Sequence, residues 1–482
     1  MKSYDVAIIG CGITGAAAAF ALSRFKVSLV VLEAENDVAD STTKANSGIL
    51  HAGYDPPAGS LMAKLNVRGV ELGKKLCKDL DVPVRWCGSL VVALSEGQKA
   101  SVQTLYARGI ANGVSGMQLL SASQTRNFEP NISPDAACAL YAPTAGVVYP
   151  WEYALAFIET AVRNGTELQR NFHVTAIQRS ESGYRITSSS GESVSARYVI
   201  NAAGLYADQI HNMVAAPSFK LLPSKGEYYL LDKNQAGLVK HVVFQCPDKN
   251  GKGTLVAPTA GGNIIVGPNA AASAKEDVSV TQKGLDYVAA QAKKSVPSLD
   301  VRSSIRNFAG MRANNDRGDF IIEEAADAPG FIDLAGIKSP GLTSAPAIGE
   351  RCLMLLEHSG LALQEKSEYC KTRTRVKFNE LSVKEKQEII SKNPLYGRII
   401  CRCETVTEGE IIDALRSPVP PVSIDGIKRR CGAGMGRCQG GFCSPRVMEI
   451  LMNERHVSWK DIIQDKAGSY MLTGRTKTQE SL

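Results

Sequence analysis

No uninterrupted run of about 20 apolar residues, the length that a helix needs to cross a bilayer, occurs in this sequence. The longest apolar stretch, Val6 to Leu22, is interrupted by glycines and followed by charged residues. It also lacks the small-residue cleavage site of a secretory signal, so we do not expect export. We therefore expect a cytoplasmic protein without a membrane span.

Aromatic residues are scarce, at 6% of the 482 positions, and repeats and low-complexity tracts are absent. With 44% hydrophobic and 21% charged residues, the composition is that of a soluble globular protein. It excludes a disordered, collagen-like or coiled-coil chain. The length allows roughly two to four domains.

Charge of one sign is in small excess, with 55 Lys and Arg against 48 Asp and Glu. Residues 366–482 contain 21 basic and 14 acidic residues, and the rest of the chain contains 34 of each. No basic stripe with interleaved aromatic residues accompanies this excess, which argues against nucleic-acid binding. We interpret it as a solvated surface that suits an acidic partner or membrane headgroups.

A glycine-rich turn follows the first apolar segment. Residues 4–9 are typical of a buried parallel strand, and an alanine-rich helix is predicted over 16–24. Such a turn lets the backbone approach a pyrophosphate, and the helix N-terminus offers N–H groups to the phosphates. The turn has the pattern G-x-G-x-x-G, formed by Gly10, Gly12, Ile13, Thr14 and Gly15.

An acidic residue stands where a dinucleotide site needs one. A second strand, predicted over 27–32, is followed by Glu33, close to the offset at which an acid hydrogen-bonds a ribose hydroxyl. Strand, turn, helix and acid together predict dinucleotide binding, and a merely structural glycine turn is the alternative.

Two later segments favour FAD over NAD. Residues 195–208 combine a predicted strand with a small-residue turn, and they resemble the second signature of FAD-dependent oxidoreductases of the D-amino-acid-oxidase-like superfamily. Residues 336–347 predict a glycine-rich loop that opens a helix, so that backbone N–H groups face the flavin. An ordinary helix cap is the alternative for this loop.

Residues 41–54 and 59–68 resemble the FAD-dependent glycerol-3-phosphate dehydrogenases and oxidases, especially the soluble bacterial forms. The related L-2-hydroxyglutarate dehydrogenases share much of this segment. The resemblance continues through residues 308–312 and the C-terminal cysteines, so it covers nearly the whole chain. It implies an α/β fold with a Rossmann-like FAD-binding domain, an antiparallel substrate-binding sheet and a small helical C-terminal iron–sulfur domain.

The resemblance also implies catalytic and binding roles. His51 matches the histidine that lies over the flavin and assists deprotonation of the substrate hydroxyl, for which an imidazole suits neutral pH. Arg312 matches a cation that holds the anionic end of the substrate, and its guanidinium suits phosphate or carboxylate equally. Lys252 matches a second cation more loosely, and a surface lysine is the alternative. The residues implied to bind FAD are Gly10, Gly12, Ile13, Thr14, Gly15, Glu33, Thr42, Thr43, Asn46, Ser47, Gly48, Val174, Ala203, Gly204, Gly336, Ser339, Gly341, Leu342 and Thr343.

Four of the twelve cysteines form two closely spaced pairs. Cys401 and Cys403 stand in C-x-C, and Cys438 and Cys443 in C-x4-C. In a cytoplasmic protein such pairs predict a four-sulfur site for iron–sulfur or zinc rather than disulfides. Cys431 is extra to the pattern, and we interpret it as a non-ligand.

The segment between the two pairs suits an anionic centre. The glycine-rich turn over 432–436 offers backbone N–H groups to sulfur, and positive charge is expected from Lys428, Arg429, Arg430 and Arg437. The module resembles the bacterioferritin-associated-ferredoxin-like [2Fe–2S] domain, with a zinc knuckle as the alternative. A cluster beside FAD converts hydride chemistry into single-electron delivery, so a redox partner protein or a quinone-linked membrane subunit is implied.

We expect an oxidoreductase over residues 1–365, a linker over 366–393, the [2Fe–2S] domain over 394–457 and a tail over 458–482. Within the oxidoreductase, FAD is expected mainly at 1–80, 145–215 and 305–360, and the substrate-binding sheet mainly at 81–144 and 216–304. The implied reaction oxidises sn-glycerol 3-phosphate to dihydroxyacetone phosphate. The alternatives are a dehydrogenase or oxidase of L-2-hydroxyglutarate or another 2-hydroxy acid, and a non-catalytic sensor subunit that binds FAD and metal.

Overall fold

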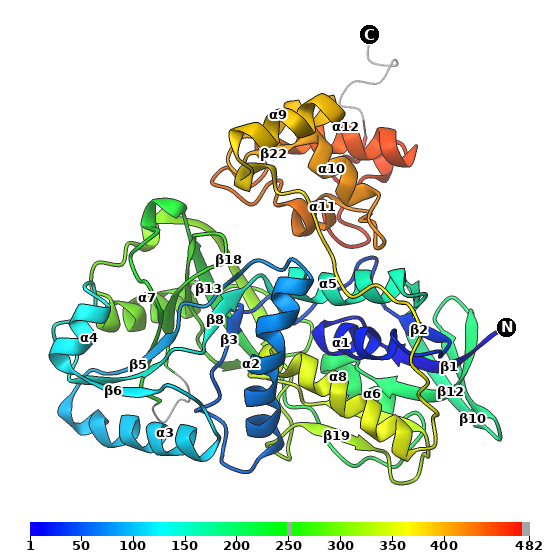
Figure 1. Cartoon of the computed structure of the whole chain (residues 1–482), viewed down its shortest axis with the longest axis horizontal. Helices are drawn as coiled ribbons and strands as arrows, with labels where there is room; N and C mark the ends of the chain where they lie inside the picture. Colours follow the sequence, from blue (N-terminus) through cyan, green and yellow to red (C-terminus); the bar gives the residue numbers. More distant parts are fainter. Residues whose placement is uncertain (248–252, 475–482) are drawn as a thin grey trace. The chain divides into compact units, whose positions relative to one another are not determined.

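The structure is a computed structural model that describes residues 1–247 and 253–474. The chain divides into two compact units (Figure 1). Unit 1 comprises residues 1–34 and 38–373, and unit 2 comprises residues 35–37 and 374–482. Among the described residues, no helix combines the length and the hydropathy needed to span a bilayer.

Unit 1 contains an eight-stranded sheet built around β1 (Lys2–Ile9). This buried strand pairs in parallel with β2 (Leu29–Leu32) and β12 (Ser193–Asn201), as its continuous apolar run predicts. The strand order is β10-β11-β12-β1-β2-β9, with β20 parallel to β12 and β19 antiparallel to β20. The remaining strands are β9 (Glu167–Gln169), β10 (Val174–Ser180), β11 (Gly183–Ser188), β19 (Ile321–Glu324) and β20 (Phe331–Ala335).

Helices pack together beside this sheet. α1 (Ile13–Leu22) packs against α5 (Pro150–Arg163) and α8 (Gly341–His358), and α8 also packs against α2 (Leu61–Asp79). α1 begins three residues before the predicted start, because the helix N-cap is Gly12 inside the glycine turn. The turn after β12 leads through η2 (Gly204–Tyr206) into the short α6 (Ala207–His211).

A nine-stranded, mostly antiparallel sheet forms the other half of unit 1. Its strand β13 (Ser224–Leu231) pairs with β16 (Ile264–Gly267), β17 (Ala271–Ala272) and β18 (Ser304–Arg312). Only the pair of β5 with β14 is parallel among the described strands of this sheet. The other strands are β5 (Ser89–Ala93), β6 (Gln118–Ser121), β7 (Cys138–Ala142), β14 (Val242–Gln245) and β15 (Leu255–Pro258).

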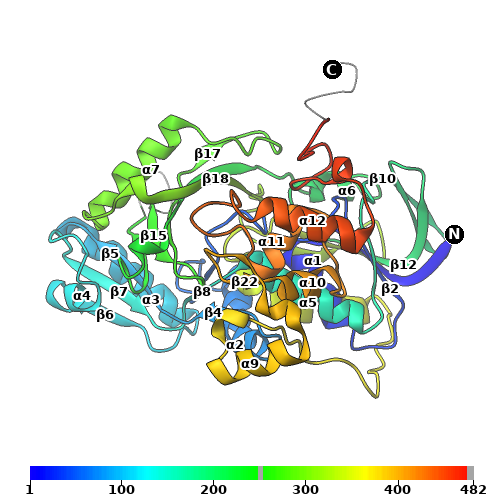
Figure 2. The same ribbon diagram turned by 90° about the horizontal axis from the view of Figure 1, so that it is seen from above.

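Three helices and a small sheet complete unit 1. α3 (Lys99–Ala111) and α4 (Ala122–Phe128) lie at the end of the unit far from β1, and α7 (Gln282–Ser295) packs on β13 and β16 (Figures 1 and 2). The small sheet has the order β3 (Ile49–Leu50), β8 (Gly146–Val148), β4 (Val84–Arg85). Short 3₁₀ turns are η1 (Glu96–Gln98), η3 (Lys233–Gln235) and η4 (Val301–Ser303).

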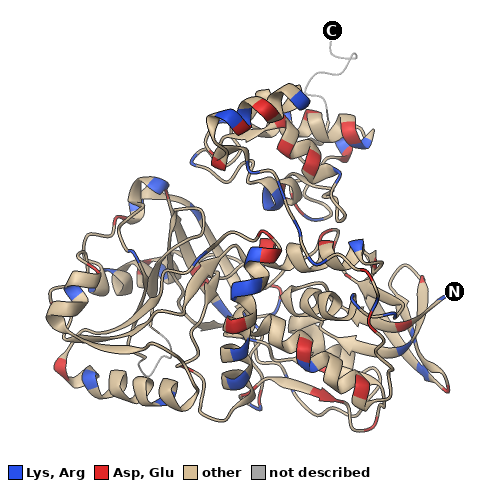
Figure 3. Ribbon diagram, in the orientation of Figure 1, with Lys and Arg blue, Asp and Glu red and all other residues tan. Residues whose placement is uncertain are grey.

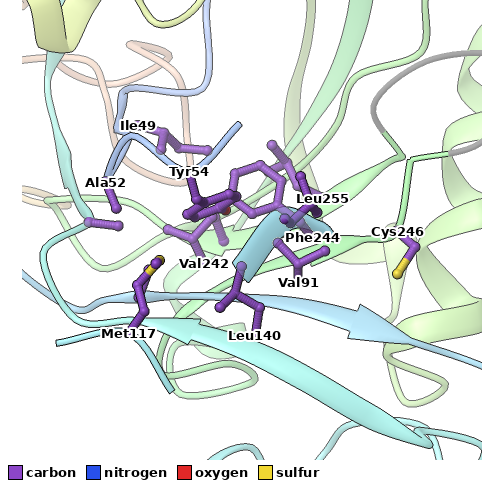
Figure 4. Close-up of a cluster of buried hydrophobic side chains, with 14 of the residues drawn as sticks. Ile49, Ala52, Tyr54, Val91, Met117, Leu140, Val242, Phe244, Cys246 and Leu255 are labelled. Carbon is purple, nitrogen blue, oxygen red and sulfur yellow. The ribbon is translucent and has the colours of Figure 1, made fainter. Parts of the chain in front are cut away.

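Both faces of the nine-stranded sheet are buried. Along β5, Leu90 and Val92 belong to one hydrophobic cluster, whereas Val91 and Ala93 belong to another. The second cluster (Figure 4) joins the sheet to the segment after β3, including Tyr54. This face of the sheet is therefore the one that meets the segment after β3.

Unit 2 is a small, mainly helical domain. Its hairpin joins β21 (Ile399–Cys401) to β22 (Val406–Thr407). Basic and acidic residues are interspersed along the ribbon of the whole unit (Figure 3). The range predicted as a linker contains a helix, α9 (Val383–Lys392), because Ser382 and Glu385 form a capping box at its start. Its other elements are α10 (Glu408–Leu415), α11 (Ile424–Cys431), α12 (Ser444–Arg455), η5 (Phe378–Glu380), η6 (Pro394–Gly397) and η7 (Trp459–Asp461).

Candidate active site and candidate cluster site

The glycine turn after β1 lies against the turn after β12. Gly10 has φ +97°, and a Cβ there would lie 2.5 Å from the carbonyl oxygen of Ala202. A Cβ at Gly15 would lie 2.0 Å from the carbonyl oxygen of Gly10. Glycine at these positions lets two backbone loops meet at the carboxyl ends of parallel strands, which is where α/β sheets bind dinucleotides.

The start of α1 suits a phosphate group. Its N-cap, Gly12, makes no side-chain cap, and the N–H of Ile13 donates to Thr43 Oγ1 at 3.0 Å. Glu33 faces the same turn, with Oε2 2.7 Å from the N–H of Cys11. A helix N-terminus with close glycine backbone donates to the phosphates of FAD, and a carboxylate just after the next strand accepts from a ribose hydroxyl, so these residues fit the cofactor.

Residues 42–48 form a loop that packs between strands. Asn46 shapes it, because its amide donates to the carbonyls of Thr42 (3.1 Å) and Thr43 (2.9 Å) and accepts from the N–H of Gly48 at 2.8 Å. A Cβ at Gly310 of β18 would lie 1.7 Å from the carbonyl oxygen of Ala45. The loop, which includes Ser47, therefore runs directly against β18, the strand of the nine-stranded sheet that ends in Arg312.

The predicted catalytic histidine meets the predicted FAD loop. The N–H of His51 donates to Thr343 Oγ1 at 2.8 Å, and its Nε2 lies 3.1 Å from Ser339 Oγ. Leu342 and Thr343 lie in the first turn of α8, which begins at Gly341 without a side-chain cap. Gly336 has φ +64° and opens the loop.

The imidazole of His51 also contacts the nine-stranded sheet. Its ring stacks on Phe244 of β14, with centroids 5.7 Å apart and planes at 25°. Asn66 of α2 donates to the His51 carbonyl at 2.6 Å, which fixes the backbone. Phe244 belongs to the buried cluster of Figure 4. His51 is therefore held between the FAD loop and this face of the sheet.

Arg312 ends β18 on the same face of the sheet. Its guanidinium donates to the carbonyls of Asn269 at 2.9 Å and Lys225 at 3.3 Å. Phe308, four residues earlier on the strand, stacks on Tyr228 with centroids 4.9 Å apart. Burial raises the pKa of the Tyr228 hydroxyl, and the charge of the nearby Arg312 opposes that rise.

Four other predicted residues have different outcomes. Lys252 lies outside the described residues. Val174 begins β10, and the N–H of the neighbouring Phe172 donates to the carbonyl of Glu33 at 2.8 Å. Ala203 and Gly204 form the turn after β12, where Gly204 has φ +57°.

A buried polar network beneath that turn escaped sequence reasoning. Asn201, the last residue of β12, donates to Asp333 at 2.7 Å and to the Ala207 carbonyl at 2.8 Å. His211 Nδ1 lies 2.6 Å from the other oxygen of Asp333, whose pKa is raised by burial. Asn201 lies within the 195–208 segment that the sequence singles out, whereas Asp333 and His211 stand in no motif. A polar residue within an apolar strand was a usable signal for Asn201 and Asp333. Phe244 and Tyr228, which line the site, carried no sequence signal.

In unit 2 the four predicted cysteines form two pairs. The Sγ atoms of Cys403 and Cys438 are 3.7 Å apart, close to the ~3.8 Å expected for two thiolates bound to one tetrahedral metal with bonds of about 2.3 Å. The second pair is Cys401 with Cys443, where a hydrogen bond lowers the pKa of Cys401 and raises that of Cys443. Within the described residues no three such side chains enclose a single ion. Two pairs fit a two-iron cluster better than one zinc ion.

The surroundings of the pairs agree with thiolate ligands. The N–H of Gly434 in the glycine turn contributes to the lowered pKa of Cys401, and that of Phe442 is the main cause of the lowered pKa of Cys438. Burial raises the pKa of Cys431 to about 12, so its thiol stays protonated.

The predicted positive charges around the cluster site divide into two groups. Arg429 and Arg430 are buried, and Arg430 donates to the Val419 carbonyl at 2.9 Å. These two arginines and Lys428, which pairs with Asp425 at 2.6 Å, are bonded within unit 2, whereas Arg437 is exposed beside Cys438.

Comparisons with known proteins identify two family regions in the chain. Residues 5–353 match the model of the FAD dependent oxidoreductase family, and residues 399–453 match the BFD-like [2Fe-2S] binding domain. A glycerol 3-phosphate dehydrogenase of Caloramator mitchellensis is 46% identical over 99% of both chains. The human mitochondrial L-2-hydroxyglutarate dehydrogenase is 30% identical over 72% of this chain and 87% of its own.

A solved structure gives the same result for the fold. The FAD-bound L-α-glycerophosphate oxidase of Mycoplasma pneumoniae is 32% identical, with a TM-score of 0.75 over 78% of this chain and 100% of that one. The predicted α/β fold class and both predicted cofactors are thereby confirmed. The chain belongs to the FAD dependent oxidoreductase family and carries a C-terminal BFD-like [2Fe-2S] binding domain, so its cofactors are FAD and a [2Fe–2S] cluster.

Proposed function

We propose that this enzyme is a dehydrogenase that oxidises sn-glycerol 3-phosphate to dihydroxyacetone phosphate. The observation that carries the proposal is the position of His51, between the loop that opens α8 and the sheet face on which Arg312 lies. The full-length similarity to a relative named glycerol 3-phosphate dehydrogenase supports the same substrate.

Oxidation of a secondary alcohol removes a hydride from carbon and a proton from the hydroxyl. Bound FAD supplies the hydride acceptor. The imidazole of His51 takes the proton at a ring nitrogen, since an imidazole suits proton transfer at neutral pH and this one lies beside the loop that opens α8. Ser339, 3.1 Å from Nε2, orients the ring.

Arg312 binds the phosphate of the substrate. Its guanidinium is half-buried and fixed by two backbone carbonyls, so its direction is set before substrate arrives. Lys252 remains a proposed second cation. Residues 1–365 are proposed as the oxidoreductase and 394–457 as the cluster domain.

The FAD contacts are proposed for the loops already described. Gly10 to Gly15 would hold the phosphates of FAD, Glu33 would hold its ribose, and the 42–48 loop and residues 336–343 would hold its flavin. The cysteines proposed to hold the cluster are Cys401, Cys403, Cys438 and Cys443. A cluster held by these cysteines would supply one-electron transfer between reduced flavin and a separate acceptor, a redox partner protein or a quinone-linked membrane subunit.

A second substrate deserves a direct comparison, because a guanidinium binds carboxylate as well as phosphate. Anaerobic titration of the holoenzyme with sn-glycerol 3-phosphate and with L-2-hydroxyglutarate, followed by flavin absorbance, separates the two. Bleaching at catalytic rates by glycerol 3-phosphate alone is expected. Bleaching by the hydroxy acid alone would reassign the substrate, and bleaching by neither would leave the sensor alternative.

A further inference from the structure

Unit 2 exposes one end of its four-cysteine site. Cys401 and Cys443 are 1% and 3% exposed and belong to the hydrophobic core of the unit. Cys403 is exposed and Cys438 is half-buried, and these two form the pair with Sγ atoms 3.7 Å apart. A metal atom held by this pair would lie at the surface of unit 2, where an external electron acceptor could approach it.

An exposed aromatic ring stands beside that end. Phe442 is 87% exposed, the largest value among the large hydrophobic side chains of the described residues. It lies in the loop between Cys438 and Cys443, and its own N–H is directed at Cys438. A ring this exposed contributes little to the packing of its unit, whereas aromatic residues are enriched in protein interfaces.

The charge at this end is positive. Arg402 stands between Cys401 and Cys403, and Arg437 precedes Cys438, and both side chains are exposed. Glu404 is the acidic neighbour and is half-buried. The basic excess of the chain lies wholly in residues 366–482, and residues 1–365 carry equal numbers of basic and acidic residues. An acidic surface is therefore the electrostatic complement.

We propose that Phe442, the exposed cysteine pair and the two flanking arginines form the docking surface for a separate acidic protein that accepts one electron at a time. The proposal rests on the proposed function, which requires such an acceptor. Apolar contact at the ring and charge attraction around it give association that weakens with salt, so a carrier can bind and leave. Oxidation of one alcohol yields two electrons and two protons. Two acceptor molecules are each reduced by one electron, and the protons pass to water.

The test uses the holoenzyme with oxidised cytochrome b5, an acidic one-electron protein, as the probe and basic cytochrome c as the contrast. Phe442→Ala and Arg437→Glu are compared with Val383→Ala and Lys392→Glu, which alter exposed positions of α9. Calorimetric titration should show roughly tenfold weaker binding of cytochrome b5 to the first two variants only. Reduction of cytochrome b5 should slow in parallel, and iron content and cluster absorbance should match the unaltered protein.

Two outcomes overturn the proposal. One is binding of cytochrome b5 that neither substitution nor salt weakens. The other is unchanged probe binding together with a different defect in the two variants. Slower electron transfer from reduced FAD to the cluster would assign the surface to a contact within this chain, and loss of self-association would assign it to a second copy. The titration needs no substrate. A failure of glycerol 3-phosphate to bleach the flavin would therefore refute the proposed substrate, whereas the measured binding of cytochrome b5 would still test the docking surface.

Discussion

The imidazole of His51 lies against the ring of Phe244, with centroids 5.7 Å apart and planes at 25°. On its other side, Nε2 lies 3.1 Å from Ser339 Oγ. Phe244 is in a buried strand and Ser339 is in the loop before α8, so contacts from two separate elements orient the imidazole. A base held this way needs little reorganisation when substrate binds.

Replacing His51 with Asn should slow flavin reduction by glycerol 3-phosphate by about 10²–10⁴-fold, because the amide cannot take the hydroxyl proton. The amount of FAD bound per protein should not change, since the backbone N–H at position 51 still donates to Thr343. Anaerobic stopped-flow absorbance measures the rate. His173→Asn, at an exposed position of the same unit, is the control. Reduction of the His51 variant at the wild-type rate would assign the proton to another group.

Phe244 acts through His51, and its removal should have a smaller effect. Phe244→Ala opens space beside the imidazole, so we expect kcat to fall roughly tenfold while KM changes little. Phe244→Leu refills part of that space and should recover part of the rate. A rise in KM with unchanged kcat would show that the ring contacts substrate instead of positioning the histidine.

Arg312→Lys keeps the charge and loses the planar fork. The ammonium cannot reach both backbone carbonyls that fix the guanidinium, so kcat/KM for glycerol 3-phosphate should fall about 10–100-fold. Activity with glycerol, which has no phosphate, should be unaffected. Steady-state kinetics on both substrates measure the difference, and Arg306→Lys on the exposed part of β18 is the control. An equal loss with glycerol would indicate a structural role.

The sequence was sufficient to predict those features that residues close together in the chain form by themselves. The strand–turn–helix of Gly10 to Gly15 and the paired cysteines are local patterns whose spacing carries their geometry. The packing of His51 on Phe244 could not be predicted from the sequence, because Phe244 lies 193 residues after His51 and belongs to another sheet. The network of Asn201, Asp333 and His211 likewise depends on parallel pairing of β12 with β20, which no single segment encodes.

Gly10→Ala should abolish tight binding of FAD. A Cβ at this position would meet a backbone carbonyl oxygen at 2.5 Å, so the two turns that frame the cofactor must separate. Gly113→Ala is a matched control, because Gly113 also has a positive φ, +82°, but has no atom within 4 Å of the added Cβ. Both variants share the cost of about 1–2 kcal/mol for placing an alanine at a positive φ. The difference in FAD binding between the two variants therefore reports the clash at Gly10. The flavin-to-protein ratio after gel filtration measures it, and equal ratios would contradict the role of the turn.

Cys403→Ser and Cys431→Ser test the assignment of the cluster ligands. Cys403 shares a 3.7 Å contact with Cys438, so its loss should deprive one iron of a thiolate and lower the iron content and the visible cluster absorbance. Cys431 donates to the Ile427 carbonyl at 3.3 Å, and burial keeps its pKa at about 12, so its replacement should leave iron unchanged. The flavin content should stay normal in both variants, since these cysteines belong to unit 2 and the FAD loops to unit 1. Loss of iron from the Cys431 variant with retention in the Cys403 variant would exchange their roles, and would mean that the cysteine pairs described here do not hold the metal.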